Sequence, residues 1–288
     1  MMPQTGGNCV EDKTSRALLA EDLITKRYRK TIWKDFISAL KQYRMTEEND
    51  RIAVCVSGGK DSFLLAKCMQ LLQKHSDFPF ELCFLAMDPG YSPENRRMIM
   101  DTAADLNIPL DIFDSEILSV AERSASPCHV CAAMRRGYLY KEAQKRQCNK
   151  IALGHHFDDV CETVLLSMLY GGEFKTMMPR LDSVNYAGMQ LIRPLYHVRE
   201  KNIISWTNAC GVTAVTCACN VTRREDGGKR KEIKRLLADL EKGNPQVLSN
   251  IFASTQAVNL RTVLSYRNGR DEPAISTLDK PHSLDKAT

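Results

Sequence analysis

The sequence predicts an α/β fold in which a parallel sheet carries helices on both of its faces. Short apolar runs of strand length alternate with longer amphipathic stretches between residues 52 and 170, and this alternation is typical of sheets built from βαβ units. In addition, Ser57, Asp88 and Gly154 each follow the end of an expected strand. Ligands of such sheets bind at the carboxyl ends of the strands, so we expect these three positions to meet at one edge.

The expected elements follow one another along the chain. The strands are the short apolar runs Ile52–Val56, Phe80–Met87, Leu110–Phe113 and Lys150–Leu153, with Met189–Arg193 as an edge strand. The helices are the longer periodic stretches Phe63–Gln73, Glu94–Leu106, Ala132–Gln147, Asp158–Tyr170, Glu200–Ala209, Lys229–Glu241 and Val247–Leu264. The order strand, helix, strand favours parallel pairing, because a crossover helix returns the chain to the same end of the sheet.

We expect the sheet to lie in one domain, residues 49–215, with helical additions at both ends. An amphipathic pattern over Ser15–Arg44 makes 16–48 an N-terminal helical segment. Residues 216–267 form a cysteine-bearing loop followed by helices. The polar ends, 1–15 and 268–288, are predicted to be disordered.

Composition indicates a globular protein of a reducing compartment. The chain has 288 residues, of which 43% are hydrophobic and 26% charged, so material for a core is ample. We find no apolar stretch long enough to span a bilayer and no apolar signal segment at the N-terminus. An odd number of cysteines, 11, then favours a cytoplasmic location, where paired cysteines bind metals more often than they form disulfides. The net charge of +5 permits an RNA partner without requiring one.

One short stretch of the N-terminal helical segment concentrates basic residues. Five basic side chains interleave there with two aromatic rings: Lys26, Arg27, Arg29, Lys30 and Lys34 with Tyr28 and Trp33. Such a stretch could contact RNA phosphates. A solvated helix face explains it equally well, and the sequence leaves both interpretations open.

Residues 57–62, Ser-Gly-Gly-Lys-Asp-Ser, predict a phosphate-binding loop between a strand and a helix. Glycines let the backbone approach an anion, and the free N–H groups and dipole of the helix favour it. The pattern GxxxxGK[ST] is absent, so this is not an ordinary P-loop. The segment resembles the PP-loop of the ATP pyrophosphatases, which transfer AMP. The resemblance implies that the pyrophosphate of ATP is held by Ser57, Gly58, Gly59, Asp61 and Ser62, with Lys60 offsetting its charge.

A second motif, residues 154–163, reads Gly-His-His-Phe-Asp-Asp-Val-Cys-Glu-Thr at an expected junction of strand and helix. Mg²⁺ favours oxygen ligands, so Asp158 or Asp159 is expected to hold it, with Asp61 assisting. A capped helix start explains one aspartate but not the doubled histidine and aspartate. The motif is similar to that of tRNA-modifying PP-loop enzymes, including the lysidine synthetases. We therefore place Gly154 and His155 in the nucleotide site.

Cysteines form a third motif. Cys128 and Cys131 make a CxxC pair, and Cys217 and Cys219 make a CxC pair far downstream. Three thiolates on a [4Fe–4S] cluster would leave one iron free for another ligand, whereas four thiolates would suit a structural zinc. Disulfide exchange by the first pair and a strand through the second are further interpretations, and the spacing alone leaves the choice open.

Taken in order, the motifs resemble the TtcA-type tRNA 2-thiocytidine synthetases over roughly residues 27–261. The shared set is SGGKDS, CxxCxxxRRGYLY, GHHxDDxxET, LYGG with Met178-Pro179, and IRPL with Arg199-Glu200-Lys201. The resemblance implies a [4Fe–4S] cluster on three cysteines, two of which are Cys128 and Cys131. The family's third cysteine lies in a CxxC pair, which here is CxC. We expect Cys219 because it directly precedes the polar loop, with Cys217 as the alternative.

The same resemblance implies a reaction. ATP, with Mg²⁺, would adenylate the C2 oxygen of cytidine 32 in the tRNA anticodon loop, and sulfur would replace it, giving 2-thiocytidine, AMP and pyrophosphate. The donor would be sulfide or a persulfide, for instance from a cysteine desulfurase, and a homodimer is left open. The expected catalytic residues are Lys60, Asp61, Cys128, Cys131, Asp158 and Asp159. Asp88 would approach the adenosine, and contacts to tRNA phosphates are expected from Arg135, Arg136, Lys175, Arg180 and Arg193.

Other functions fit parts of the pattern. A PP-loop thiolase could use a cysteine persulfide, with Cys128 and Cys131 as sulfur carrier and resolving thiol. A PP-loop tRNA thiouridine synthetase is a separate alternative. An RNA-binding protein with a structural zinc and a vestigial nucleotide site is the non-enzymatic alternative. The charged members of both nucleotide-site motifs are intact, which argues against a vestigial site.

Overall fold

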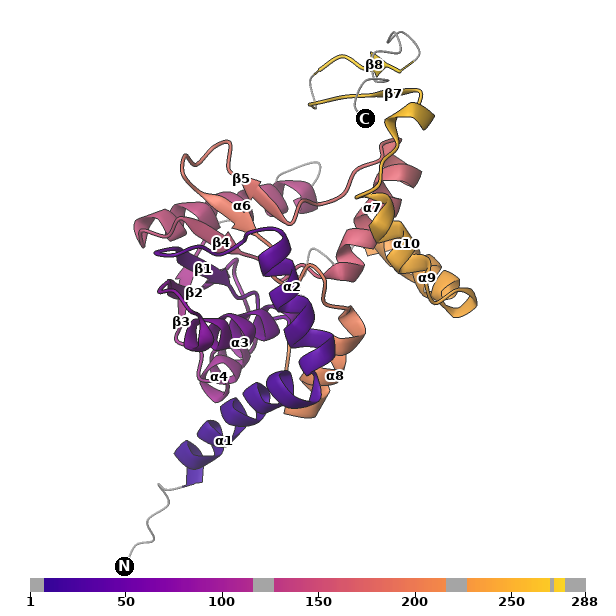
Figure 1. Cartoon of the computed structure of the whole chain (residues 1–288). Coiled ribbons are helices and arrows are strands. Elements are labelled where there is room, and N and C mark those ends of the chain that lie inside the picture. Colours follow the sequence, from indigo (N-terminus) through magenta and orange to yellow (C-terminus); the bar gives the residue numbers. More distant parts are fainter. Residues whose placement is uncertain (1–7, 116–126, 216–226, 270–271, 278–288) are drawn as a thin grey trace, which may run out of the picture.

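A six-stranded sheet forms the centre of the computed structural model, which describes residues 8–115, 127–215, 227–269 and 272–277. Its strand order is β3-β2-β1-β4-β6-β5 (Figure 1). The strands are β1 (Arg51–Cys55), β2 (Glu81–Asp88), β3 (Leu110–Asp114), β4 (Lys150–Ala152), β5 (Arg180–Asp182) and β6 (Gln190–Ile192). All neighbours pair in parallel except β5 and β6. The expected parallel α/β fold is therefore confirmed.

The direction in which strands are added reverses between β1 and β4. From β1 the chain adds β2 and β3 on one side and, after a return, β4 and β6 on the other. At such a switch point, the loops that follow the two central strands diverge and leave a crevice at the carboxyl edge. The loop that begins at Ser57 follows β1, and the loop that begins at Leu153 follows β4.

Alternate residues of β1 enter two separate cores. Ile52 and Val54 lie in the larger core, under α3 (Lys60–His75), α4 (Pro93–Asp105) and most of the other helices. Ala53 and Cys55 face the opposite way and pack with Leu139 of α6 (Pro127–Lys145). This alternation follows from the two-residue period of a strand, and it explains why nearly every residue of β1 is apolar.

The N-terminal helical segment packs on α8 (Glu200–Cys210), as Figure 1 shows in indigo and orange. It consists of α1 (Asn8–Asp22), the π-helical turns η1 (Leu23–Arg27) and η2 (Arg29–Trp33), and α2 (Lys34–Gln42). The indole Nε1 of Trp206, a fully buried residue of α8, donates a hydrogen bond to the carbonyl of Ala20 at 3.2 Å. Residues 8–15 are helical, so the prediction of disorder throughout 1–15 is wrong. Gly6 and Gly7 are the last strong helix breakers before this stretch.

The hairpin of β5 and β6 corrects a second prediction. The expected strand Met189–Arg193 exists as β6, but it pairs with β4 on one side and β5 on the other. The edge strand is β5, which the sequence did not predict. Three residues with a charged start and end, Arg180–Asp182, carry too short a pattern to be recognised as a strand.

The C-terminal part differs most from expectation. Helices α7 (Phe157–Gly171), α9 (Gly227–Gly243) and α10 (Val247–Ser254) pack together, but α10 ends ten residues earlier than the predicted helix to Leu264. The hydroxyls of Ser254 and Thr255 donate to the carbonyls of Ile251 and Phe252, and so satisfy acceptors at the helix end. A 3₁₀ turn, η4 (Leu260–Thr262), and a two-stranded sheet follow, formed by β7 (Ser265–Tyr266) and β8 (Ile275–Ser276). Part of the tail that we expected to be disordered is thus paired.

Within the part of the chain that the structure describes, none of the helices combines the length and the apolar character needed to cross a membrane.

Candidate active site at the carboxyl edge of the sheet

The loop that follows β1 is closed by a serine. Gly58 adopts a φ of 81°, and Gly59 caps the N-terminus of α3. The hydroxyl of Ser62 accepts a hydrogen bond from the N–H of Ser57 at 3.1 Å and donates one to the carbonyl of Gly59 at 2.8 Å. The first N–H groups of a helix have no acceptor within the helix, so the loop presents them to the crevice as an anion site.

Two glycines let this loop pack closely on its neighbours. A Cβ atom at Gly58 would lie 2.6 Å from Cγ1 of Ile99 in α4. A Cβ atom at Gly154, in the loop after β4, would lie 3.1 Å from the backbone carbon of Asp61. The loops after β1 and β4 are therefore in backbone contact, as the predicted shared edge requires.

Lys60 lies between two carboxylates. Its Nζ is 3.0 Å from Oδ1 of Asp61 and 3.1 Å from Oε1 of Glu200. Burial lowers the pKa of Lys60, but the two carboxylates together outweigh burial and raise it above the ordinary value, so the ammonium is charged at neutral pH. Glu200 also pairs with Lys234 of α9 at 2.6 Å. Burial raises the pKa of Glu200, yet its two lysine partners bring it down to about 2.

Three buried polar atoms around the crevice lack hydrogen bonds, and they come from the loops after three different strands. They are Oδ1 of Asp61, Nδ1 of His155 and Nε of Arg193, which follow β1, β4 and β6. Oδ1 of Asp61 is near Lys60, but the geometry of that contact is an ion pair without a directed hydrogen bond. Unpaired buried groups are rare in folded proteins, so these atoms mark a place where a ligand is expected to bind.

His155 is neutral at physiological pH. Burial is the main cause that lowers its pKa to about 4, and the positive charge of Arg193 adds to the effect. The guanidinium of Arg193 itself lies in a buried setting, which lowers its pKa to about 10, and one of its N–H groups donates to the carbonyl of Met178. A neutral imidazole beside a charged guanidinium offers a ligand both an acceptor and a donor.

The second histidine and the two aspartates hold helices together. His156 caps α7, because its Nδ1 accepts from the N–H of Asp159 at 3.4 Å while Oδ2 of Asp159 accepts from the N–H of His156 at 3.0 Å. Asp158 accepts from the N–H of Glu200 at 2.7 Å and from the guanidinium of Arg199. The doubled aspartates thus have structural partners, and Mg²⁺ binding by either stays a prediction.

Asp159 also carries the contact to α9. Its Oδ1 is 3.2 Å from the guanidinium of Arg230, which in addition binds Glu162 at 2.8 Å. Burial raises the pKa of Asp159, but the neighbouring histidine His156, together with its backbone N–H and other cations, lowers it overall. Arg230, Lys234 and Glu200 were not predicted as site residues. A signal in the sequence existed for Glu200 alone, which lies in the Arg-Glu-Lys motif. Arg230 and Lys234 had none, because tertiary packing of α9 brings them to the site.

Asp88, at the end of β2, is committed to its own loop. Its Oδ1 accepts from the N–H groups of Gly90 and Tyr91 at 2.8 and 2.7 Å, and its Oδ2 is 2.6 Å from Arg96. The structure places Asp88 at the predicted edge, but as a residue that shapes a turn. Its expected contact with adenosine stays a prediction.

The expected RNA contacts are spread over several elements. Arg136 is exposed on α6, Lys175 is exposed and pairs with Glu173, and Arg180 donates to the carbonyl of Arg44 at 2.9 Å. Arg193 lies at the crevice itself, as described above. The side chain of Arg135 lies outside the described residues.

Ten of the eleven cysteines divide into two groups, and the side chain of Cys9 lies outside the described residues. Six are free thiols packed in or against the two cores: Cys55, Cys68, Cys83, Cys148, Cys161 and Cys210. Burial raises the pKa of each of them, to about 12 for Cys55, Cys161 and Cys210, so in this fold they are protonated at neutral pH. Among the described side chains we find no group of three that could hold a metal ion.

Cys128 and Cys131 belong to the first part of α6, although their side chains lie outside the described residues. Since α6 ends just before β4 begins, its first turn lies toward the carboxyl edge of the sheet. Cys217 and Cys219 also lie outside the described part, which stops at Val215. The N–H of Val215 donates to the carbonyl of Gly58 at 2.9 Å. Both cysteine pairs are therefore adjacent in sequence to backbone at the crevice.

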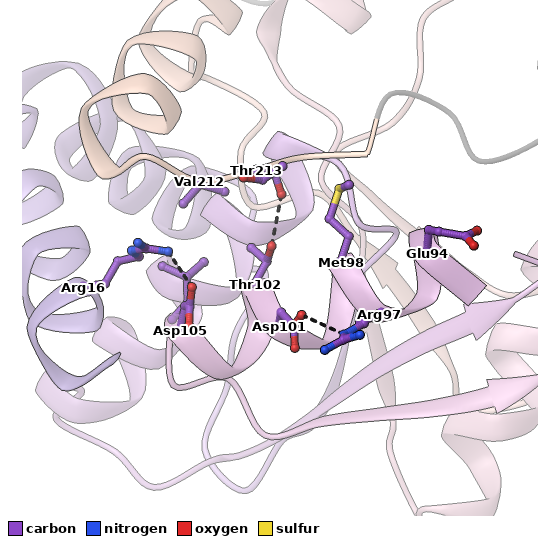
Figure 2. A pocket seen from close by; sticks show the side chains of 10 residues that line it. Arg16, Glu94, Arg97, Met98, Asp101, Thr102, Asp105, Val212 and Thr213 are labelled. Carbon is purple, nitrogen blue, oxygen red and sulfur yellow. Dashed lines mark hydrogen bonds and ion pairs between the residues drawn. The ribbon is translucent and has the colours of Figure 1, made fainter. Parts of the chain in front are cut away.

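A hollow of about 400 Å³ lies elsewhere, between α1, α4 and the loop after α8 (Figure 2). Four of its five charged side chains pair among themselves, Arg16 with Asp105 and Arg97 with Asp101, and the fifth is Glu94. The hydroxyl of Thr102 donates to the carbonyl of Thr213 across it. Its described lining offers no unpaired buried polar atom to a ligand, and we assign it no function.

Comparison with known proteins agrees with this geometry. A family model described as a PP-loop domain matches residues 32–237. The tRNA-cytidine(32) 2-sulfurtransferase of Alkalilimnicola ehrlichii is 34% identical, over 85% of this chain and 82% of its own. That of Geobacter metallireducens is 35% identical, over 83% and 93%.

Among solved structures, the U34-tRNA thiolase NcsA from Methanococcus maripaludis, which contains a [4Fe-4S] cluster, superimposes with a TM-score of 0.61. It is 20% identical and covers 77% of this chain and 76% of its own, so it shows a shared fold. With a PP-loop domain over most of the chain and relatives of this identity over more than four fifths of their length, the protein belongs to the family of the tRNA-cytidine(32) 2-sulfurtransferases.

Proposed function

We propose that this protein is an ATP-dependent sulfurtransferase that converts cytidine 32 of tRNA to 2-thiocytidine, releasing AMP and pyrophosphate. The observation that carries the proposal is the set of three unpaired polar atoms, of Asp61, His155 and Arg193, beside a PP-loop. The loop supplies a nucleotide site, and the other two atoms supply a site for a second polar reactant next to it. The relatives named above are sulfurtransferases for the same nucleotide.

In this proposal, the loop after β1 holds the pyrophosphate of ATP. The N–H groups at the start of α3 donate to its oxygens, and Lys60 neutralises its charge after exchanging a carboxylate partner for phosphate. Oδ1 of Asp61 is the carboxylate oxygen that fits Mg²⁺, because it is buried and accepts no hydrogen bond. The metal would offset the charge of the phosphates.

The cytosine is held between His155 and Arg193. Cytosine offers acceptors at O2 and N3, which match the free N–H of Arg193, and neutral His155 adds a further polar contact. O2 attacks the α-phosphate, and pyrophosphate leaves. Sulfide then forms the C–S bond at C2, while the C–O bond breaks and AMP leaves with the oxygen. If the donor is a cysteine persulfide, its outer sulfur forms the C–S bond, and a second cysteine thiol then breaks the S–S bond and ends in a disulfide. A base in a loop reaches such a site once it is unstacked.

Cys128, Cys131 and Cys219, with Cys217 as the alternative, would hold a [4Fe–4S] cluster. Two observations support this: α6, which carries the first pair, begins toward the carboxyl edge of the sheet, and Val215, the last described residue before the second pair, is bonded to Gly58. When bound, such a cluster supplies an iron site for sulfur with only three protein ligands. A sulfide or persulfide donor, a cytoplasmic location and a homodimer belong to the same proposal.

The test is nucleoside mass spectrometry of tRNA from cells that lack this protein. We expect 2-thiocytidine to disappear and to return when the wild-type gene is restored. In vitro, unmodified tRNA should stimulate pyrophosphate release, and a tRNA with uridine at position 32 should not. Persistence of 2-thiocytidine in cells that lack the protein would refute the proposed substrate, and full activity of iron-free protein would favour a persulfide on the cysteines.

A further inference from the structure

We propose that the basic segment, residues 26–34, binds the phosphate backbone of the tRNA and so aligns the substrate with the crevice. The inference rests on the proposed function, since it assigns a surface to that substrate. Five basic residues and no acidic ones lie in these nine positions. The whole chain has 40 basic and 35 acidic residues, so the basic segment accounts for the entire surplus of positive charge.

The charges of the basic segment are largely uncompensated. Lys26 pairs with Asp22 at 2.7 Å, and the guanidinium of Arg27 lies over the ring of Tyr28 at 5.4 Å. Arg29, Lys30 and Lys34 are exposed and form no ion pair with any described residue. Burial raises the pKa of the adjacent Asp35 and the charge of Lys34 lowers it, so Lys34 has one acidic neighbour just outside the segment. A helix face that is merely solvated usually carries opposite charges three or four residues apart, which are absent after Lys26. Free cations on one face favour a polyanion as the partner.

The basic segment is fixed to the body of the protein. Ile24 and Ile32 are fully buried, and the side-chain amide of Asn202 in α8 donates to the carbonyl of Thr31 at 3.2 Å. The segment overlaps the end of the π-helical turn η1 and contains all of η2, and such turns are rare in proteins and recur at functional sites. Because the apolar side of the segment is anchored in the core, its backbone has a fixed position, and the long basic side chains extend from it into solvent.

Its position links the basic segment to the crevice. Asn202 lies two residues after Glu200, which binds Lys60 of the PP-loop, so the first turn of α8 makes both contacts, from opposite sides of the helix. At the other end, α2 leads to Arg44, whose carbonyl holds Arg180. The first turn of α8 therefore joins the basic segment to the nucleotide site, and Arg180 of β5 adds a further basic side chain where the chain leaves α2.

The kind of contact follows from the aromatic residues. Tyr28 and Trp33 are half-buried and pack on the core, and Trp33 stacks on Phe36 with ring centroids 5.5 Å apart. Their rings are thus used in packing, and the segment lacks the exposed rings on which unpaired bases stack. What it offers is positive charge alone, which binds phosphates and positions RNA without reading its sequence.

The experiment compares two triple variants of the anaerobically purified full-length protein. Arg27→Gln/Lys30→Gln/Lys34→Gln removes three charges from the basic segment. Lys74→Gln/Arg97→Gln/Lys145→Gln removes three exposed charges from α3, α4 and α6 as the matched control. The affinity for an unmodified tRNA transcript is measured between about 50 and 200 mM salt, a range over which phosphate contacts weaken strongly.

We expect the first variant to bind tRNA at least tenfold more weakly at low salt and to lose about two units of the slope of log K against log salt. The control should keep both values, and both variants should bind ATP as the wild type does. Equal tRNA binding by the first variant and the wild type would overturn the inference, as would an equal loss in the control. If the wild type itself fails to bind tRNA, the proposed function fails instead.

Discussion

Asp61, His155 and Arg193 each keep a buried polar atom without a hydrogen bond. An unpaired buried polar atom costs about 1–3 kcal/mol of folding free energy, because the atom has lost its water. Asp88 shows the contrasting case, since its carboxylate accepts two hydrogen bonds from its own loop and one from Arg96 of α4. The two aspartates lie at the same edge of the sheet but differ in their hydrogen bonds. The carboxylate of Asp88 finds its partners when the protein folds, whereas Oδ1 of Asp61 is left to find one in a ligand.

This contrast predicts opposite effects of the same substitution. Asp61→Asn should leave the free energy of unfolding within about 0.5 kcal/mol of wild type. It should lower tRNA-dependent pyrophosphate release at least a hundredfold, since the amide is a poor ligand for Mg²⁺. Asp88→Asn should instead destabilise the fold by about 1–3 kcal/mol. Urea unfolding and a pyrophosphate assay measure both, and full activity of Asp61→Asn would contradict the assignment.

His155 predicts a pH dependence of stability. Its pKa is about 4 in the folded protein and about 6.5 when unfolded, so the unfolded chain binds the proton first as the pH falls. The histidine therefore gives its full stability above pH 6.5, and that contribution is lost between pH 6.5 and 4. His155→Gln should flatten the decline over this window. Urea unfolding of both proteins at several pH values tests this, and parallel curves would contradict it.

At the scale of elements, α9 ties the C-terminal helices to the site through charge. Arg230 binds Glu162 of α7, whose side chain is 6% exposed, and Lys234 binds Glu200. Burial raises the pKa of Glu162 more than Arg230 lowers it. The charged form of this carboxylate therefore depends on Arg230 for its stabilisation. The loop that carries Cys217 and Cys219 precedes α9 in the sequence, so the position of α9 fixes where that loop must end.

Removal of the arginine should therefore leave a buried charge uncompensated. We expect Arg230→Gln to lower the free energy of unfolding by about 1–3 kcal/mol, a range reduced by the partial exposure of the arginine. Adding Glu162→Gln should restore part of the loss, because the pair then contains no buried charge. Thermal and urea unfolding of the wild type, the single variants and the double variant give the free energies for a double-mutant cycle. An additive loss in the double variant would show that the two side chains act independently.

The turn between β1 and α3 depends on the absence of a side chain. Gly58 and Gly172 both have a positive φ, but only Gly58 has neighbours within reach of a Cβ atom. Gly172→Ala should cost about 1 kcal/mol from backbone strain alone. Gly58→Ala adds a clash with Ile99 and should cost at least 1 kcal/mol more and weaken ATP binding. Equal losses in the two variants, measured by unfolding and ATP titration, would exclude the clash.

At the scale of the whole molecule, patterns that repeat locally were predictable and contacts between distant segments were not. The apolar run of β1 and the glycines after it identify a strand and a phosphate loop, because each has a local physical cause. The roles of Asp158 and Asp159 were not predictable, since their partners Arg199 and Arg230 lie 41 and 71 residues away. The edge strand β5 was missed because its pairing with β6, and not its own pattern, makes it a strand.

The arrangement of the two cysteine pairs leads to a prediction for the intact protein. One pair lies in the first part of α6, and the chain toward the other leaves the described part at Val215, bonded to Gly58. Anaerobically purified protein should contain iron and inorganic sulfide and be brown. Cys128→Ala and Cys219→Ala should each abolish the colour, whereas Cys217→Ala should keep it.

Cys210→Ala is the matched control for this series, because burial raises the pKa of Cys210 to about 12 and keeps the thiol protonated. It should retain iron and sulfide at the wild-type content, with at most a loss of stability from the small cavity. If Cys217→Ala loses the cluster and Cys219→Ala keeps it, the third ligand is Cys217. A colourless protein with one zinc per chain would rule out the cluster, since zinc bound by four thiolates leaves no open position for sulfur.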